Sequence, residues 1–404
     1  MSRRRTITVS AAALTLLAGA AYVVPHGTHD GPALAPAADQ TTYVARTATA
    51  AGRTTVTPAI EREIDRVVAA GRAVPSPDVP ARRLPLASLR SAARTLLRCA
   101  TFEGQRYCLG VGWTTRTQTD VRHDLIAQMA RAPRATTGDL GPRALVAHLL
   151  DGTVNQRARR ERAELTDAAQ SVAKVWLLRH ELQGVALPTG FLARHPEART
   201  AASSPAARVA AKTAATYPEH YKILSSKRVS EQHRTYWCGP TTAQMIIWGW
   251  KKKRQTQKHW ANRLGTTTSG SSISDMVRVV NNNTGWDGAK YAGKYIVLDI
   301  GDWSAKQWWH LVERHISKYH APVILHPVLL KKYYPYLDDN ASGHFQVGRG
   351  YDRRGKRTNL LGYFEPWNQQ RFDPSEPYIA RVQWRNASRS YRANEAHFQH
   401  NIGV

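Results

Sequence analysis

The sequence predicts an α+β fold, in which a mostly helical module of residues 57–190 precedes a mixed helix-and-strand domain, residues 217–404. Up to residue 190, apolar residues recur three and four positions apart, as on the buried face of a helix. Beyond residue 217, short apolar runs alternate with helical patterns, and ten of the twelve tryptophans occur there. An Ala/Ser-rich stretch, residues 191–216, predicts a linker between them.

The first part of the chain carries several helix signals. Thr57 is expected to cap a helix that opens with Pro58, because proline fits the first helical turn. Asn155–Leu182 is predicted to form a single long helix, supported by many Arg–Glu pairs. Two shorter runs also predict helices: Leu86–Leu97 and Leu145–Leu150. Only Cys108–Trp113 has the pattern of a strand in this module.

The second part of the chain predicts alternating strands and helices. The strand candidates are Lys294–Leu298, Pro322–Leu325, His344–Gly348 and Leu360–Phe364. The helix candidates are Pro240–Trp250, Ser274–Asn281 and Lys306–Tyr319. The run Thr266–Ser272 predicts a mobile loop, which either borders a cleft or is ordinary surface.

The chain is strongly basic, with 57 Lys and Arg against 30 Asp and Glu and a formal net charge of +27. Such a charge favours anionic partners, for example nucleic acid, anionic lipid or a cell wall. The basic residues are spread along the chain and no nucleic-acid-binding motif accompanies them, so a specific nucleic-acid partner is not expected. A hydrophobic content of 42% is enough for a buried core.

The first residues predict export. Arg3–Arg5 precede an apolar stretch, Ile7–Val24, and small residues then offer cleavage sites at Ala18–Ala20 or Ala35–Ala37. This layout is typical of a secretory signal peptide, assigned here to residues 1–37, although an uncleaved anchor is the alternative. We therefore expect a secreted protein, extracellular or associated with the cell wall, with no membrane span after cleavage.

Export changes the interpretation of the three cysteines. Cys99 and Cys108 flank a short segment that could turn back at Gly104, so a disulfide between them is the simplest assignment in an oxidising compartment. Cys238 is then left without a partner. An odd cysteine in a secreted protein indicates either an intermolecular link or a reactive thiol.

The surroundings of Cys238 favour a reactive thiol. Pro240 fits the first turn of a helix, whose far end carries the cations of Lys251–Arg254. Cys238 would then lie at the positive end of the helix dipole, where the thiolate is favoured and the pKa of the thiol falls. The alternative is a buried structural cysteine, the usual fate of a free cysteine.

A thiolate nucleophile needs a proton partner, and His344 is the preferred candidate among sixteen histidines. It opens a strand directly after a polar loop, a position that holds an imidazole rigidly beside a cleft. Histidines such as His259, His310, His315, His320 and His326 are expected on the surface or in the core. No grouping of His, Cys, Asp or Glu has zinc spacing, so we expect no metal and no other cofactor.

Several segments together resemble a known family. They are Gln232, Trp237–Pro240, Trp260–Thr266, Gly343–Phe345, Gly350–Asp352 and Phe364–Trp367. This ordered set resembles the C39-like family of papain-fold cysteine peptidases over about residues 220–370. The resemblance implies a papain-like catalytic domain in the C-terminal half.

The resemblance also implies roles for particular residues. Cys238 would attack a scissile carbonyl, His344 would exchange the proton, and Gln232 would donate into the oxyanion hole. The family usually has an Asp before a Pro as the third residue, whereas this sequence has Glu365 before Pro366. The longer carboxylate puts the orienting role in doubt. Asp373 and Asn368 are the alternatives for it, and a solvated strand-end carboxylate is the other interpretation of Glu365.

These features predict a secreted cysteine peptidase acting on a peptide or protein substrate. Amide hydrolysis or acyl transfer on cell-wall peptides would use the same thiolate, and the positive charge suits an anionic wall. A catalytically silent binding module with the same fold is the alternative of another class. The helical module would be either a pro-segment that occludes the cleft or a targeting element, and the sequence does not separate the two.

Overall fold

The computed structural model describes residues 53–131, 136–198, 217–285, 293–355, 359–367, 369–375 and 378–404. All of them belong to one compact unit, Pro32–Val404. The expected signal peptide, most of the expected linker and Asn368 lie outside the described residues. None of the helices in the described ranges has the length and apolar character needed to span a membrane.

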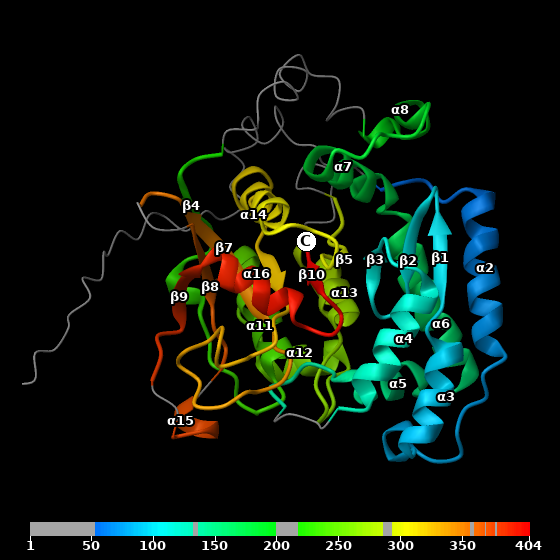
Figure 1. The fold of residues 1–404 in the computed structure, drawn as a ribbon, viewed down its shortest axis with the longest axis horizontal. Coiled ribbons are helices and arrows are strands. Elements are labelled where there is room, and N and C mark those ends of the chain that lie inside the picture. The colour runs from blue at the N-terminus through cyan, green and yellow to red at the C-terminus, as the bar shows by residue number, and fades with distance from the viewer. Residues whose placement is uncertain are drawn as a thin grey trace, which may run out of the picture. The chain divides into compact units, whose positions relative to one another are not determined.

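The N-terminal module is built mainly from helices (Figure 1). They are α2 (Pro58–Arg72), α3 (Leu86–Leu96), α4 (Gln118–Met129), α5 (Pro142–Leu150), α6 (Val154–Ala169), α7 (Val172–Gln183) and α8 (Phe191–Arg194), with a 3₁₀ turn at Ala81–Arg83. Thr57 caps α2 as expected, because its side chain accepts a hydrogen bond from the Ile60 amide. Proline follows at the first turn, where a missing N–H costs nothing.

The long helix expected over Asn155–Leu182 is wrong, because it breaks at Gln170 and Ser171. The Ser171 hydroxyl donates to the carbonyl oxygens of Asp167 and Ala168, and its amide also bonds to Ala168. Serine competes with the helix in this way because its side chain can satisfy backbone groups locally. The chain therefore turns between α6 and α7 instead of continuing straight.

Three strands accompany these helices: β1 (Cys99–Phe102), β2 (Gln105–Cys108) and β3 (Gly112–Thr114). The expectation of one strand over Cys108–Trp113 is therefore wrong, since the chain turns at Leu109–Val111 between β2 and β3. The turn at Gly104 is confirmed, with φ of 83° at Gly104 and 49° at Glu103. A two-residue hairpin needs positive φ at both positions, which glycine adopts without strain. Cys99 and Cys108 lie opposite each other in the hairpin and form the expected disulfide.

The C-terminal domain contains the expected alternation of strands and helices. Its strands are β4 (His220–Lys222), β5 (Val297–Asp299), β6 (Val323–Leu325), β7 (Gln346–Asp352), β8 (Leu360–Phe364), β9 (Val382–Asn386) and β10 (Asn401–Gly403). Its helices are α11 (Cys238–Lys251), α12 (Gln257–Leu264), α13 (Ile273–Thr284), α14 (Ala305–Glu313), α15 (Gln369–Phe372) and α16 (Ala387–Glu395). A 3₁₀ turn covers Ser226–Arg228, and α14 continues as a π-helix over Arg314–Lys318. With both helices and a mixed sheet, the fold is α+β, as the sequence predicts.

A single ten-stranded sheet runs through both parts of the chain, in the order β1-β2-β3-β5-β10-β6-β7-β8-β9, with β4 paired to β7. The junction is the parallel pair of β3 and β5, where Trp113 lies opposite Leu298. The Trp113 ring is fully buried and makes edge contacts with Phe102 and Tyr107. The helical module and the C-terminal domain therefore share one sheet and one continuous core.

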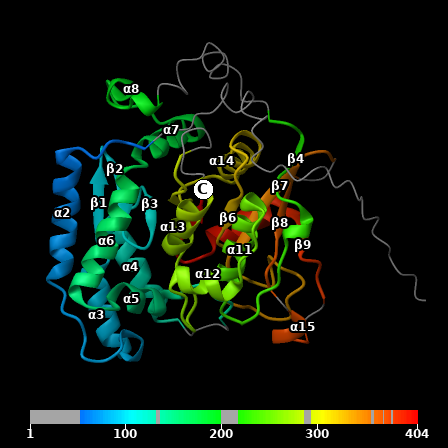
Figure 2. The same ribbon diagram turned by 180° about the vertical axis from the view of Figure 1, so that it is seen from behind.

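Helices cover the C-terminal part of the sheet on both faces. α11, α12 and α13 lie in front of it in Figure 2, and α16 lies on the opposite side, in front in Figure 1. Residues 136–141, which lead into α5, run from beside α11 and α12 to the helical module (Figure 1). This crossing brings residues of the N-terminal module to the beginning of α11.

Candidate active site

Cys238 is the first residue of α11, and it is the free cysteine of the described chain. Gly239 follows, and a Cβ atom there would lie 2.7 Å from the Ser271 hydroxyl oxygen. Glycine is therefore needed for the Thr266–Ser272 loop to approach the start of α11. The first turn of α11 packs against the start of β7, where the Thr242 hydroxyl donates to the Phe345 carbonyl at 3.1 Å. The Phe345 backbone N–H in turn faces the Cys238 sulfur. The thiol thus lies beside the residue that follows His344.

The expectation that the helix start lowers the pKa of Cys238 is wrong for this structure. Burial raises the pKa of the thiol well above its usual value, and the negative charges of Asp139 and Glu365 add to the effect. The Phe345 and Gly239 amides act in the opposite direction but do not outweigh burial. The side chain has no exposed area, so the helix dipole acts on a thiol that water does not reach.

His344 lies immediately before β7 and is also fully buried. Its amide bonds to the Pro327 carbonyl at 2.8 Å, which fixes the main chain. Its Nε2 atom lies 2.7 Å from Oε1 of Glu365. Within the described residues Nδ1 has no hydrogen-bond partner, so the contact with Glu365 leaves this ring nitrogen available.

Glu365 follows β8, and all four of its described hydrogen-bond partners are possible donors. Oε1 accepts from the Trp367 amide at 2.9 Å as well as facing His344. Oε2 accepts from the Tyr336 hydroxyl at 2.9 Å and from the Gln346 amide at 2.6 Å. Burial acts to raise the pKa of Glu365, but His344 and these donors together lower it, which keeps a charged carboxylate in a dry site.

Gln232 lies near the same site, in the loop before α11, and is buried. Its Nε2 atom donates to the carbonyl oxygens of Arg234 and Thr235, both at 2.9 Å, and faces the Thr137 carbonyl at 3.4 Å. Its amide links to the segment after β8 through the Pro366 carbonyl at 2.8 Å. In this arrangement the side chain is occupied by protein carbonyls.

The other carboxylate considered for the orienting role lies elsewhere: Asp373 accepts a hydrogen bond from the Ser375 hydroxyl. Two residues of the site, Tyr336 and Gln346, were not anticipated from the sequence. Gln346 is two positions after His344, on the same side of the extended chain, and this spacing was the available signal. Tyr336 lies in an aromatic cluster that gives no sign of its contact with Glu365.

A segment of the helical module, Thr136–Leu140, covers the Cys238 site, and we call it the cleft segment. Thr137 donates from its hydroxyl to the Gly343 carbonyl at 2.6 Å, on the side of His344. On the other side, the Ser271 amide bonds to the Gly138 carbonyl at 2.9 Å, and the Leu140 amide bonds to the Ser271 carbonyl at 3.2 Å. The Thr266–Ser272 loop therefore borders the segment that covers Cys238.

Asp139 of the cleft segment forms a fully buried cluster with His326 and His397. Its two carboxylate oxygens lie 2.8 Å and 2.9 Å from the Nε2 atoms of these rings. Burial acts to raise the pKa of Asp139, but the two rings lower it to about 2, so the residue is charged at neutral pH. The rings come from distant parts of the C-terminal domain, after β6 and after α16.

The same cluster is the group among the described residues that could hold a metal ion. His326 suits this role, because Nδ1 bonds to Oδ1 of Asn401 at 2.7 Å and leaves Nε2 free. His397 does not, because its Nδ1 accepts from the Gln399 amide at 3.2 Å, which assigns the ring proton to Nε2 and towards Asp139. The hydrogen bonds thus favour a network in which the two rings hold the charged Asp139, with His397 neutral at pH 7 because burial lowers its pKa to about 4.

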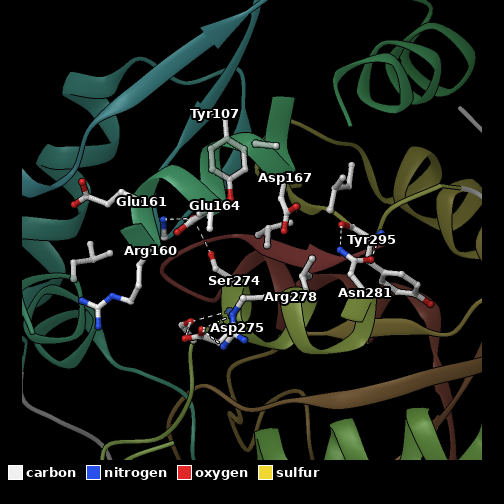
Figure 3. Close-up of a pocket in the computed structure, with 18 of the residues that line it drawn as sticks. Tyr107, Arg160, Glu161, Glu164, Asp167, Ser274, Asp275, Arg278, Asn281 and Tyr295 are labelled. Carbon is white, nitrogen blue, oxygen red and sulfur yellow. Dashed lines mark hydrogen bonds and ion pairs between the residues drawn. The ribbon is translucent and has the colours of Figure 1, made fainter. Parts of the chain in front are cut away.

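A cavity of about 400 Å³ lies away from Cys238, between α6, β2 and α13 (Figure 3). Glu164 projects into it and accepts from the Tyr107 hydroxyl at 2.9 Å, the Gly110 amide at 2.8 Å and the Ser274 hydroxyl at 3.1 Å. Burial raises the pKa of Glu164. These contacts connect the helical module to α13.

An α+β domain with a cysteine at a helix start, near a histidine–carboxylate pair at the ends of neighbouring strands, is typical of cysteine peptidases. The family model described as Peptidase_C39 like family matches residues 225–394, so the C-terminal half contains a C39-like domain. This match confirms the resemblance seen in the sequence. Searches of curated proteins and of solved structures found no match.

Proposed function

We propose that the protein is a cysteine peptidase in which Cys238 is the nucleophile, His344 the general base and acid, and Glu365 the orienting carboxylate. The observation that carries the proposal is the short contact of 2.7 Å between His344 and Glu365, beside a thiol that faces the Phe345 amide. The match to a peptidase-type family over residues 225–394 supports the same class of reaction.

The geometry suits acyl transfer through a thioester. Glu365 holds Nε2 of His344, so that Nδ1 takes the thiol proton while the sulfur attacks the carbonyl carbon of the scissile bond. The leaving amine then takes that proton, and water hydrolyses the thioester to regenerate the thiol. The backbone N–H of Cys238 and the Gln232 amide would stabilise the oxyanion, once Gln232 turns from its present carbonyl partners.

Glu365→Gln should weaken turnover without abolishing it. Each carboxylate oxygen accepts from a donor, so the new amide group places donor against donor. The loss in kcat/KM should be about 10- to 100-fold smaller than the loss caused by removing the nucleophile, as for orienting carboxylates in other triads. Glu365→Asp is the matched control, since it keeps the charge. Equal losses for both variants and for the nucleophile variant would contradict an orienting role.

The reaction class is tested by incubating the protein with unstructured proteins and with isolated cell-wall peptides, and identifying products by mass spectrometry. Cleavage of peptide bonds, stopped by alkylation of Cys238, would support a peptidase. Cleavage or transfer only on wall peptides would favour the amidase or acyltransferase alternative, which the net charge of +27 makes reasonable. If Cys238 is exposed and reacts with alkylating agents but no substrate is turned over, the result would favour a binding module.

We also propose that the protein acts outside the cell or at the cell wall, on the basis of the N-terminal sequence pattern and the disulfide. Cys99 and Cys108 form a disulfide in the structure, and such bonds persist in oxidising compartments. Detection of a mature N-terminus within or directly after residues 1–37 in culture medium would support export. Recovery of the intact chain only from the cell interior would overturn it.

A further inference from the structure

The cleft segment Thr136–Leu140 is bound to the catalytic domain through its main chain. The Ser271 amide and carbonyl bond to Gly138 and Leu140, so Asp139 forms a short parallel bridge with Ser271. Binding through backbone hydrogen bonds is how proteins commonly hold an extended peptide, because every sequence offers the same groups. The Ser271 side of this site is thus equipped to receive a peptide chain.

The segment also passes directly over the reactive position. A Cβ atom on Gly138 would lie 2.6 Å from the carbonyl carbon of Tyr236 and 2.9 Å from the backbone nitrogen of Cys238. Gly138 has a φ of 117°, which residues with side chains rarely adopt. The carbonyl of Thr137 lies 3.4 Å from the Gln232 amide, the group assigned to the oxyanion hole. Glycine is therefore required for the chain to pass here.

Two further contacts anchor the segment to the C-terminal domain. The Asp139 carboxylate is held between His326 and His397, at 2.8 Å and 2.9 Å. The Thr137 amide bonds to the Ser342 hydroxyl at 2.9 Å, in the loop that leads to His344. The Asp139 carboxylate and both rings are buried, whereas the Thr137–Ser342 hydrogen bond is partly buried. A buried carboxylate needs such partners, so the two rings hold the segment in place.

We propose that Thr136–Leu140 occupies the peptide-binding groove of the catalytic domain and keeps the enzyme latent, and that Ser271 binds the substrate main chain once the segment leaves. The latency rests on the proposed peptidase function, whereas occupation of the groove does not. The inference assigns an inhibitory role to one segment of the helical module. It also identifies Gly270 and Ser271 as a wall of the groove, since a Cβ atom on Gly270 would overlap the Gly138 carbonyl oxygen.

The state of the thiol agrees with this assignment. Burial raises the pKa of Cys238, and the nearest negative groups from the packed elements, Asp139 and Glu365, raise it further. Removing the segment would expose the sulfur to water and remove the Asp139 charge, so the pKa of the thiol would fall towards its usual range. The closed form should accordingly react slowly with alkylating agents at neutral pH, and faster as pH rises.

The direct test replaces Gly138 by valine, whose side chain has no room against the Cys238 backbone. Alkylation of Cys238 by iodoacetamide at pH 7 should accelerate by at least about tenfold, because the strained closed state loses population. Gly141→Ala is the matched control, since nothing lies within 4 Å of a Cβ there. Circular dichroism and thermal unfolding establish that each variant is folded.

A second variant and a synthetic peptide keep the proposal testable if the Gly138→Val variant does not fold. Asp139→Ala removes the carboxylate that His326 and His397 hold and should also accelerate alkylation. A synthetic peptide with the sequence of residues 134–141 should slow alkylation of either opened variant, whereas the same peptide with valine for Gly138 should not. Equal alkylation of the wild type and both folded variants would overturn the proposal. Fast alkylation without peptide turnover would instead support groove occupation and overturn the peptidase function.

Discussion

Cys238→Ala will abolish peptide hydrolysis while leaving the protein folded. The substitution removes the only described free thiol, and no neighbouring side chain can form the thioester in its place. Turnover should fall by at least about 10³-fold, as for loss of a nucleophile in other triads. The measurement is kcat/KM with a peptide substrate, in the wild-type background and in the Gly138→Val background, where the groove is open.

The folding control for Cys238→Ala is thermal unfolding. Loss of one buried sulfur atom should cost about 1 kcal/mol or less after partial relaxation of the site. Comparable turnover in the alanine variant would show that another group performs the chemistry. Collapse of folding in both Cys238→Ala and Glu365→Gln would recast these positions as structural residues.

Trp113→Ala will strongly destabilise the whole protein, not only the helical module. The ring is fully buried where β3 meets β5, against Phe102 and Tyr107. Truncating such a tryptophan typically costs about 3–5 kcal/mol in the free energy of unfolding. Urea unfolding followed by circular dichroism should show a lower midpoint in a single transition, since the sheet continues across the junction.

Trp384→Ala serves as the control for Trp113→Ala. Trp384 lies on β9 and keeps 37% of its surface exposed, so its removal should cost much less. Two separate transitions in the Trp113→Ala variant, with the C-terminal domain unchanged, would contradict the shared core. In that case the helical module would be an independent unit attached to a complete catalytic domain.

Local sequence patterns predict much of this fold. The cap at Thr57, the start of α11 at Cys238 and the strand Leu360–Phe364 follow from capping, proline position and apolar runs within a few residues. The contact of His344 with Glu365 follows from the family resemblance together with neighbouring strands. Each of these features is determined by residues that are close together in the sequence, and for that reason the sequence predicts it.

Other features depend on contacts between residues far apart in the chain. The break at Ser171 is set by a single side chain that bonds to backbone carbonyls three and four residues earlier, against a helical pattern on both sides. The position of Gly138 against Cys238 joins residues a hundred positions apart, and no local pattern marks it. The raised pKa of Cys238 follows from that contact, because burial outweighs the helix dipole. The sequence predicts helix α11, but it does not predict which residues cover Cys238 at the start of that helix.

The position of β10 has a consequence for how the chain folds. Asn401–Gly403 lie between β5 and β6 at the middle of the sheet, and Asn401 also fixes the ring of His326 (Figure 1). Until these residues arrive, the two halves of the sheet present unpaired edges that other chains could join. Folding should therefore be slow and prone to association while synthesis is incomplete. On the proposed function, a nascent chain that lacks these residues has no complete catalytic domain, so turnover should begin only after synthesis is finished.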